Sequence, residues 1–139
     1  DWRFSATVDA QYSSDTLISG EQFGAGGVYS VRGFEERVIS ADSGVRASLE
    51  AQTGNRNSWV KDWLPRVNFV TFVDAATLKV NRAPGAPTTS PALASVGAGV
   101  RFAFRPEHQF KLDLARVITG LPTQPSGDLM LHFSFISVL

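Results

Sequence analysis

Arg32 stands out because it lies among residues that favour burial. It follows Val31 and precedes Gly33 and Phe34, within a stretch at 15–42 that has no sustained alternation of polar and apolar residues. A guanidinium stays charged at any physiological pH, so burying it requires a carboxylate or several other acceptors. The chemistry predicted for this loop is therefore ion pairing in a polar interior.

No residue pattern indicates catalysis or a cofactor. The glycine cluster Gly24, Gly26 and Gly27 permits sharp bends and close packing, but it lacks the Lys-Ser/Thr of a phosphate loop. His108 and His132 are far apart, and no spacing of His, Asp and Glu suggests a metal site. No serine has a histidine and an acid in a recognisable arrangement. We therefore expect a protein that is not an enzyme and has no cofactor and no metal.

Composition narrows the class of protein. Thirteen Lys and Arg residues balance 13 Asp and Glu residues among 139, so no nucleic-acid partner is expected. The absence of cysteine excludes disulfides and thiolate metal sites within this sequence. No run reaches the roughly 18 apolar residues of a membrane-spanning helix, and no signal peptide is visible. Because residue 2 already lies in a patterned segment, we expect an N-terminal portion to precede this chain.

Strands must position the loop, because the dominant pattern has a period of two. Apolar and polar residues alternate from Trp2 to Tyr12, and successive side chains of a strand point to opposite faces. The pattern predicts six strands, at residues 2–13, 44–53, 66–78, 94–104, 109–117 and 128–139, with the loop 15–42 after the first. Residues 54–65 fit less well, and Trp59 and Trp63 there indicate either a short interfacial turn or a packed loop.

A soluble β-sandwich or barrel would give the same alternation, but three features favour a membrane barrel. The predicted strands are longer than the usual 5–6 residues. Short and long connections alternate, with loose, Pro- and Gly-rich segments at 79–93 and 118–127. The polar face also carries charges, as expected of a wet lumen: Arg3, Asp9, Arg46, Glu50, Asp74, Arg101, Lys111 and Asp113.

The loop carries a family resemblance. The run from Gly20 to Phe34 reads Gly-Glu-Gln-Phe-Gly-Ala-Gly-Gly-Val-Tyr-Ser-Val-Arg-Gly-Phe. It resembles the signature of outer-membrane barrels that insert or secrete polypeptides, in which a Val-Arg-Gly-Phe/Tyr tetrad tips the sixth extracellular loop and enters the lumen. With Asp42, Ser43 and Gly44 downstream, the run most resembles the haemolysin secretion/activation transporters (ShlB/FhaC/HecB type) of two-partner secretion.

The resemblance implies an all-β fold, namely the C-terminal portion of an antiparallel transmembrane β-barrel, with about six of sixteen strands. The missing N-terminal strands and periplasmic polypeptide-transport-associated (POTRA) domains would be partners of this portion. The run Phe72-Val73-Asp74-Ala75-Ala76 matches a Phe-x-Asp-x-Gly motif of the thirteenth strand, with Ala76 in place of glycine. Phe110 to Ala115 resembles the penultimate strand, whereas Leu139 replaces the aromatic residue expected at the end.

Site residues follow from this resemblance. The functional loop motif would be Val31, Arg32, Gly33 and Phe34 together with Gly26 and Gly27, and its lumen partners would be Asp74 and Phe72. We predict a two-pronged ion pair between Arg32 and Asp74, with Phe34 and Phe72 packed around it.

The function implied is translocation of an unfolded exoprotein from the periplasm to the cell surface, by a multi-pass barrel in the lipid of the bacterial outer membrane. An insertase of the same superfamily, which releases clients into the lipid, is the first alternative, and the domains upstream would discriminate. A soluble β-barrel that binds a ligand is the second, and fractionation would test it because a soluble protein needs no detergent.

Closed transmembrane barrels have at least about eight strands, and six would leave two open edges that can pair with other chains. The isolated 139-residue chain is therefore expected to self-associate or aggregate, which light scattering can measure. A monodisperse monomer with a closed barrel would contradict this expectation.

Overall fold

Six long antiparallel strands dominate the computed structural model, which describes residues 2–53, 66–81, 89–105 and 108–137. The strands are β1 (Trp2–Gln11), β4 (Ser43–Thr53), β5 (Arg66–Lys79), β6 (Ala92–Arg105), β7 (His108–Thr119) and β8 (Leu129–Ser137). They confirm the predicted all-β antiparallel class. Trp59, Trp63 and Leu139 lie outside the described residues.

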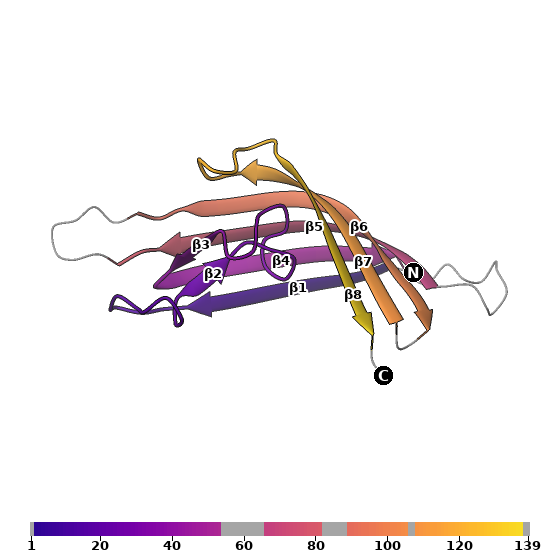
Figure 1. The fold of residues 1–139 in the computed structure, drawn as a ribbon, viewed down its shortest axis with the longest axis horizontal. Coiled ribbons are helices and arrows are strands. Elements are labelled where there is room, and N and C mark those ends of the chain that lie inside the picture. Colours follow the sequence, from indigo (N-terminus) through magenta and orange to yellow (C-terminus); the bar gives the residue numbers. More distant parts are fainter. Residues whose placement is uncertain (1, 54–65, 82–88, 106–107, 138–139) are drawn as a thin grey trace.

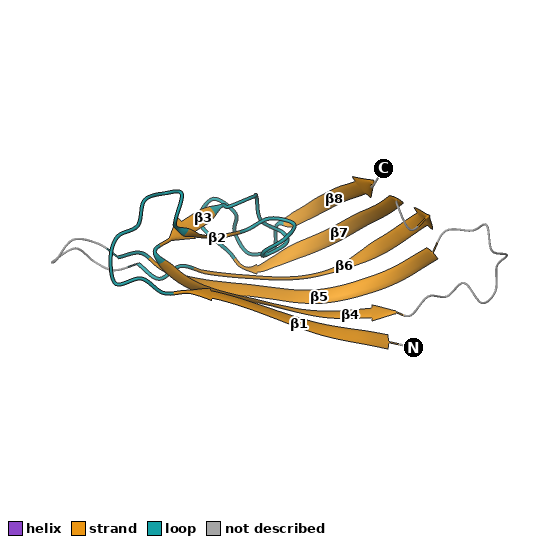
Figure 2. Ribbon diagram, turned by 90° about the horizontal axis from the view of Figure 1, so that it is seen from below, coloured by secondary structure: helices purple, strands orange, loops and turns teal. Residues whose placement is uncertain are grey.

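The strands form one sheet in the order β1-β4-β5-β6-β7-β8, so each strand pairs with the next long strand along the chain. Within the described part of the chain, β1 and β8 are each paired on one side only, and the sheet is open. The start of β1 and the end of β8 lie at one end of the sheet, and the loop that follows β1 lies at the other (Figures 1 and 2). The described residues contain no helical segment that could span a lipid bilayer.

The two faces of the sheet differ as the alternation predicts. On β5, every second residue from Val70 to Leu78 is buried and the residues between them are exposed. On β7, Asp113, Ala115 and Val117 are buried in the same way. The opposite face exposes large apolar side chains: Trp2, Phe4, Val8, Val45, Leu49, Phe69, Val73, Val96, Leu112, Leu114, Leu129, Leu131, Phe133 and Phe135.

The loop between β1 and β4 covers the buried face and contains a hairpin that the sequence did not predict. Strand β2 (Phe23–Ala25) pairs with β3 (Ile39–Ala41) as a separate two-stranded sheet. Three residues per strand are too few for a period of two to be recognised. Strand β1 also ends at Gln11, before the predicted residue 13, because Ser13 N–H donates to the Ser43 hydroxyl at 2.9 Å and leaves the ladder.

Residues on the two faces of β1 should respond differently to a charge. Val8 lies on the exposed apolar face, and Thr7 lines a cavity on the loop side. If the apolar face lies in lipid, Val8→Arg in the full-length protein should reduce barrel assembly, at a cost of about 2–4 kcal/mol near the bilayer midplane. Thr7→Arg is the matched control and should assemble. The amount of folded protein in the outer membrane measures both, and equal losses would remove the face assignment.

Candidate functional site

An apolar cluster fixes the hairpin of the loop against the sheet. Phe23, Ala25 and Ala41 of the hairpin are buried together with residues of the strands beneath them. The other buried members of this cluster are Val31, Phe34, Ala76, Leu78, Leu93 and Val117. The loop is therefore folded onto the sheet by ordinary hydrophobic burial at the end of the sheet where the loop begins.

In the connection between β2 and β3, a tight turn reverses the chain at the predicted glycine cluster. Gly27 N–H donates to Val31 O at 3.2 Å, and Ser30 N–H donates to Gly27 O at 3.1 Å. Gly27 has a φ of +105°, and a Cβ there would collide with the Glu36 carboxylate. That carboxylate accepts the Val28 N–H at 2.8 Å, so the glycine makes room for the group that closes the turn. Gly26 also has a positive φ, of +106°.

The turn directs Arg32 toward β5, where Asp74 holds it with two parallel hydrogen bonds. Arg32 Nε lies 2.7 Å from Asp74 Oδ2, and Arg32 Nη2 lies 2.8 Å from Asp74 Oδ1. The backbone N–H of Arg32 donates to the same carboxylate at 3.1 Å. Asp74 is fully buried, and Arg32 is 5% exposed. A fork that meets a carboxylate in this way fixes orientation as well as distance.

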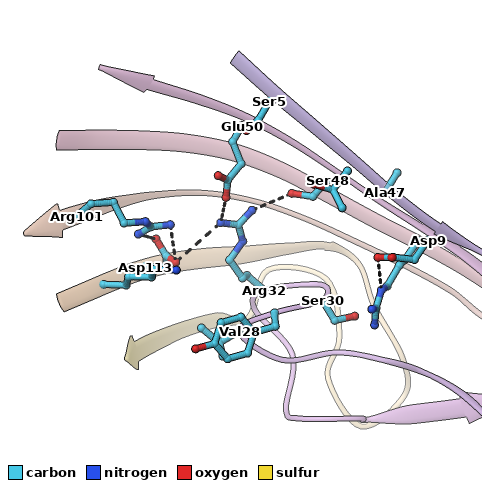
Figure 3. Close-up of a pocket in the computed structure, with 14 residues that line it drawn as sticks. Ser5, Asp9, Val28, Ser30, Arg32, Ala47, Ser48, Glu50, Arg101 and Asp113 are labelled. Atoms are coloured by element: carbon cyan, nitrogen blue, oxygen red, sulfur yellow. Dashed lines mark hydrogen bonds and ion pairs between the residues drawn. The ribbon is translucent and has the colours of Figure 1, made fainter. Parts of the chain in front are cut away.

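Strand β4 supplies further partners to the guanidinium. Arg32 Nη1 donates to Glu50, and Arg32 Nη2 donates to the Ser48 hydroxyl at 3.1 Å (Figure 3). Ser48 in turn donates to Asp74 Oδ1 at 2.6 Å. Burial opposes the charge on Arg32, but the hydrogen bonds and negative charges of Asp74 and Glu50 outweigh it and raise the pKa of Arg32. We name Arg32, Asp74, Glu50 and Ser48 the arginine latch.

A second ion pair borders the latch on β6 and β7. Arg101 donates to Asp113 through both terminal nitrogens, with Nη2 3.1 Å from Asp113 Oδ2. Arg32 Nη1 lies 3.9 Å from the same Asp113 oxygen, so one carboxylate links the two arginines. Negative and positive groups thus alternate in a row, in the order Glu50, Arg32, Asp113 and Arg101 (Figure 3). Among the described residues, no group of three or more His, Cys, Asp or Glu is arranged to hold a metal ion.

Phe72 forms the floor of the latch. Arg32 Cζ lies 3.5 Å from the centroid of the Phe72 ring, a contact in which the cation meets the negative face of the ring. The ring needs the space that Gly97 leaves on β6, because a Cβ at Gly97 would overlap it. Gly99 leaves corresponding space for the Asp113 carboxylate. Each glycine is the register partner of the residue it accommodates, Phe72 for Gly97 and Asp113 for Gly99.

The structure brings Arg32 together with the predicted Asp74 and Phe72, but Phe34 differs from the prediction. Phe34 is fully buried in the apolar cluster of the hairpin, whereas Phe72 lies in a different cluster with Val70 and Ala115. The cause is Gly33, whose φ of +95° turns the chain between Arg32 and Phe34. The Arg32 side chain therefore reaches Asp74, whereas the Phe34 ring lies in the apolar cluster.

Sequence reasoning missed two residues that contact the loop tip. The spacing of His132 suggests no metal site, yet its Nε2 on β8 accepts the Gly33 N–H at 2.9 Å. Gln124, in the connection at 118–127 that was expected to be loose, accepts the Glu35 N–H at 3.0 Å through Oε1. The alternation places His132 on the inner face of β8, and this was the available signal. Nothing in the sequence distinguished Gln124.

Comparison with known protein families decides the identity. Residues 1–102 match the family described as haemolysin secretion/activation protein ShlB/FhaC/HecB. This chain belongs to that family. Family members are outer-membrane transporters of polypeptides rather than enzymes, which is the class that the signature loop implied. Neither the curated proteins nor the solved structures gave a match.

In this member of the haemolysin secretion/activation family, Asp42 closes the base of the signature loop. The side chain is buried and accepts the N–H groups of Leu17 at 2.7 Å and Asn81 at 2.6 Å. It thereby joins three separate segments at the end of the sheet. The backbone hydrogen bond from Leu17, and then that from Asn81, stabilise the carboxylate and lower the pKa of Asp42.

Asp42→Asn should loosen this base, because one acceptor oxygen becomes an NH2 group that faces an N–H donor. Hydrogen exchange at the amides of Leu17 and Asn81 in the full-length protein should accelerate. Since the folded pKa is lowered, wild-type protection should be complete above the ordinary pKa of 3.8 and be lost only as the pH falls through the lower folded value. Asp15→Asn, at an exposed carboxylate of the same loop, is the control and should change neither amide. Unchanged exchange in Asp42→Asn would contradict this role.

Proposed function

We propose that this chain forms the C-terminal part of an outer-membrane β-barrel that passes an unfolded exoprotein from the periplasm to the cell surface, as in two-partner secretion. In this proposal, the arginine latch holds the signature loop within the barrel interior while the exoprotein passes. The observation that carries the proposal is the two-pronged, buried ion pair between Arg32 of the motif and Asp74 of β5. The match to a family of secretion/activation proteins favours transport over insertion.

The inner face beside the loop suits an extended polypeptide. A cavity of about 220 Å³ lies between the loop tip and the inner face of the sheet, and β1, β4, β6 and β7 contribute to its lining. Its lining combines hydroxyl groups with charges of both signs, among them Ser5, Thr7, Asp9, Arg46, Glu50 and Lys111. Such a lining hydrogen-bonds backbone and side chains of many sequences without burying them in an apolar site. Because no nucleotide is available in the periplasm, folding of the exoprotein outside the cell would supply the drive.

The latch restrains the loop without making the restraint permanent. A buried ion pair contributes little net stability, because desolvation of both charges offsets their attraction. Removing one partner is different, since it leaves an uncompensated charge and costs about 3–5 kcal/mol. The latch therefore specifies one position of the loop, and rearrangement requires both partners to find new polar surroundings together.

Arg32→Ala in the full-length protein should abolish or strongly reduce secretion while the barrel remains in the outer membrane. Arg32→Lys should restore only part of the activity, because an ammonium group lacks the planar fork. Arg37→Ala, at an exposed arginine of the same loop, is the matched control and should secrete normally. Secreted exoprotein and folded transporter are measured in parallel.

A double-mutant cycle tests the pairing itself. Asp74→Ala should also impair secretion, and the double variant Arg32→Ala/Asp74→Ala should be less impaired than the sum of the two single effects. The reason is that the second substitution removes the charge left unpaired by the first. Simply additive effects would show that no latch exists.

A further inference from the structure

The tip of the signature loop is held on two sides, and the arginine latch accounts for only one. The latch partners of Arg32 lie on β4 and β5. On the other side, the backbone around Phe34 is held by side chains from β8 and from the connection that precedes it. Both Gln124 and His132 lie beyond residues 1–102, the part of the chain that matches the family.

Gln124 spans Phe34 with its amide group. Its Oε1 accepts the Glu35 N–H at 3.0 Å, and its Nε2 approaches Gly33 O at 3.5 Å. The side chain thus pairs with the backbone on both sides of Phe34, as a neighbouring strand would. Two reciprocal backbone hydrogen bonds of 3.0 Å between Gln124 and Leu121 fix the residue that carries this amide. Gln124 itself is buried.

His132 completes the contact from β8. Its Nε2 accepts the Gly33 N–H at 2.9 Å, which requires a lone pair on this nitrogen and the proton of the neutral ring on Nδ1. Gly33 can present its N–H because its φ is +95°, and because a Cβ would lie only 3.2 Å from that of Ala115. Without His132 and Gln124, the Gly33 and Glu35 N–H groups would lose the acceptors that they have in this structure.

We propose that Gln124 and His132 form a backbone clamp that positions the loop tip for the arginine latch. The two are positioning residues, since their side chains hydrogen-bond to the backbone of Gly33 and Glu35. The clamp binds main-chain groups of Gly33 and Glu35, so it sets how closely the loop tip approaches β8. The latch sets the direction of the Arg32 side chain. Its significance for secretion rests on the proposed function of the loop.

The test measures loop position directly in the full-length protein, freed of other cysteines and reconstituted in lipid vesicles. Spin labels at Val28→Cys and Leu129→Cys report the distance between the loop and β8 by electron–electron double resonance. His132→Phe keeps a ring but removes the acceptor. It should raise the ratio of molecules whose loop tip is displaced from β8 to those whose tip contacts β8, on the order of 10-fold. Gln124→Met, of similar size without hydrogen bonds, should act in the same direction.

Conservative and control variants separate the hydrogen bond from packing. His132→Gln places an amide oxygen near the position of Nε2 and should keep the distance distribution of the wild type. His108→Phe is the matched control, because His108 accepts or donates at Ser137 near the other end of β8 and not at the loop. Heat-modifiable mobility on gels shows that each variant forms a folded barrel.

Two outcomes would overturn the clamp: a wild-type distance distribution in His132→Phe, or equal disturbance by His132→Phe and His132→Gln. Failure here is distinguishable from failure of the proposed function. Additive effects in the Arg32 and Asp74 cycle, with the distance results as expected, would remove the latch and leave the clamp. Coupled effects in that cycle, with undisturbed distances in His132→Phe, would remove the clamp alone.

Discussion

The structure depends on one constraint, the burial of a permanent positive charge. Arg32 cannot release its proton at physiological pH, so the protein must surround it with acceptors or leave it in water. It does the former with a buried carboxylate, a half-buried carboxylate and a hydroxyl, contributed by Asp74, Glu50 and Ser48. The ring of Phe72 beneath the guanidinium, and the glycine that makes room for this ring, follow from the same requirement.

Two kinds of interaction hold the loop, and they differ in what they permit. The hairpin near the end of the sheet is held by apolar burial, which involves Phe23, Phe34 and their neighbours and is not directional. The tip is held by charges and hydrogen bonds whose geometry is directional. Because a buried polar network is stable only when every member is satisfied, the tip has few intermediate positions. The loop is thus held by apolar packing at the hairpin and by directional polar contacts at its tip.

The loop also connects strands that are not neighbours. It contacts β4 and β5 through the arginine latch, and β8 through the hydrogen bond between Gly33 and His132. The loop lies on the buried face of the sheet, and these contacts join it to strands toward both ends of the strand order. Because the loop contacts β4, β5 and β8, its position depends on how the sheet curves between these strands.

The long strands and their faces could be predicted from the amino-acid pattern alone, because alternation with a period of two is a local property of each strand. The sequence also indicated that Arg32 needs an acid, and the family resemblance pointed to Asp74. Tertiary structure decided the rest, since alternation gives the face of a residue but not its height along the sheet. Pairing of Ser48 with Asp74 sets that height on β4, as does pairing of Gly99 with Asp113 on β7. Such register, like the reach of Gln124 and His132 to the loop, exists only once distant segments pack together.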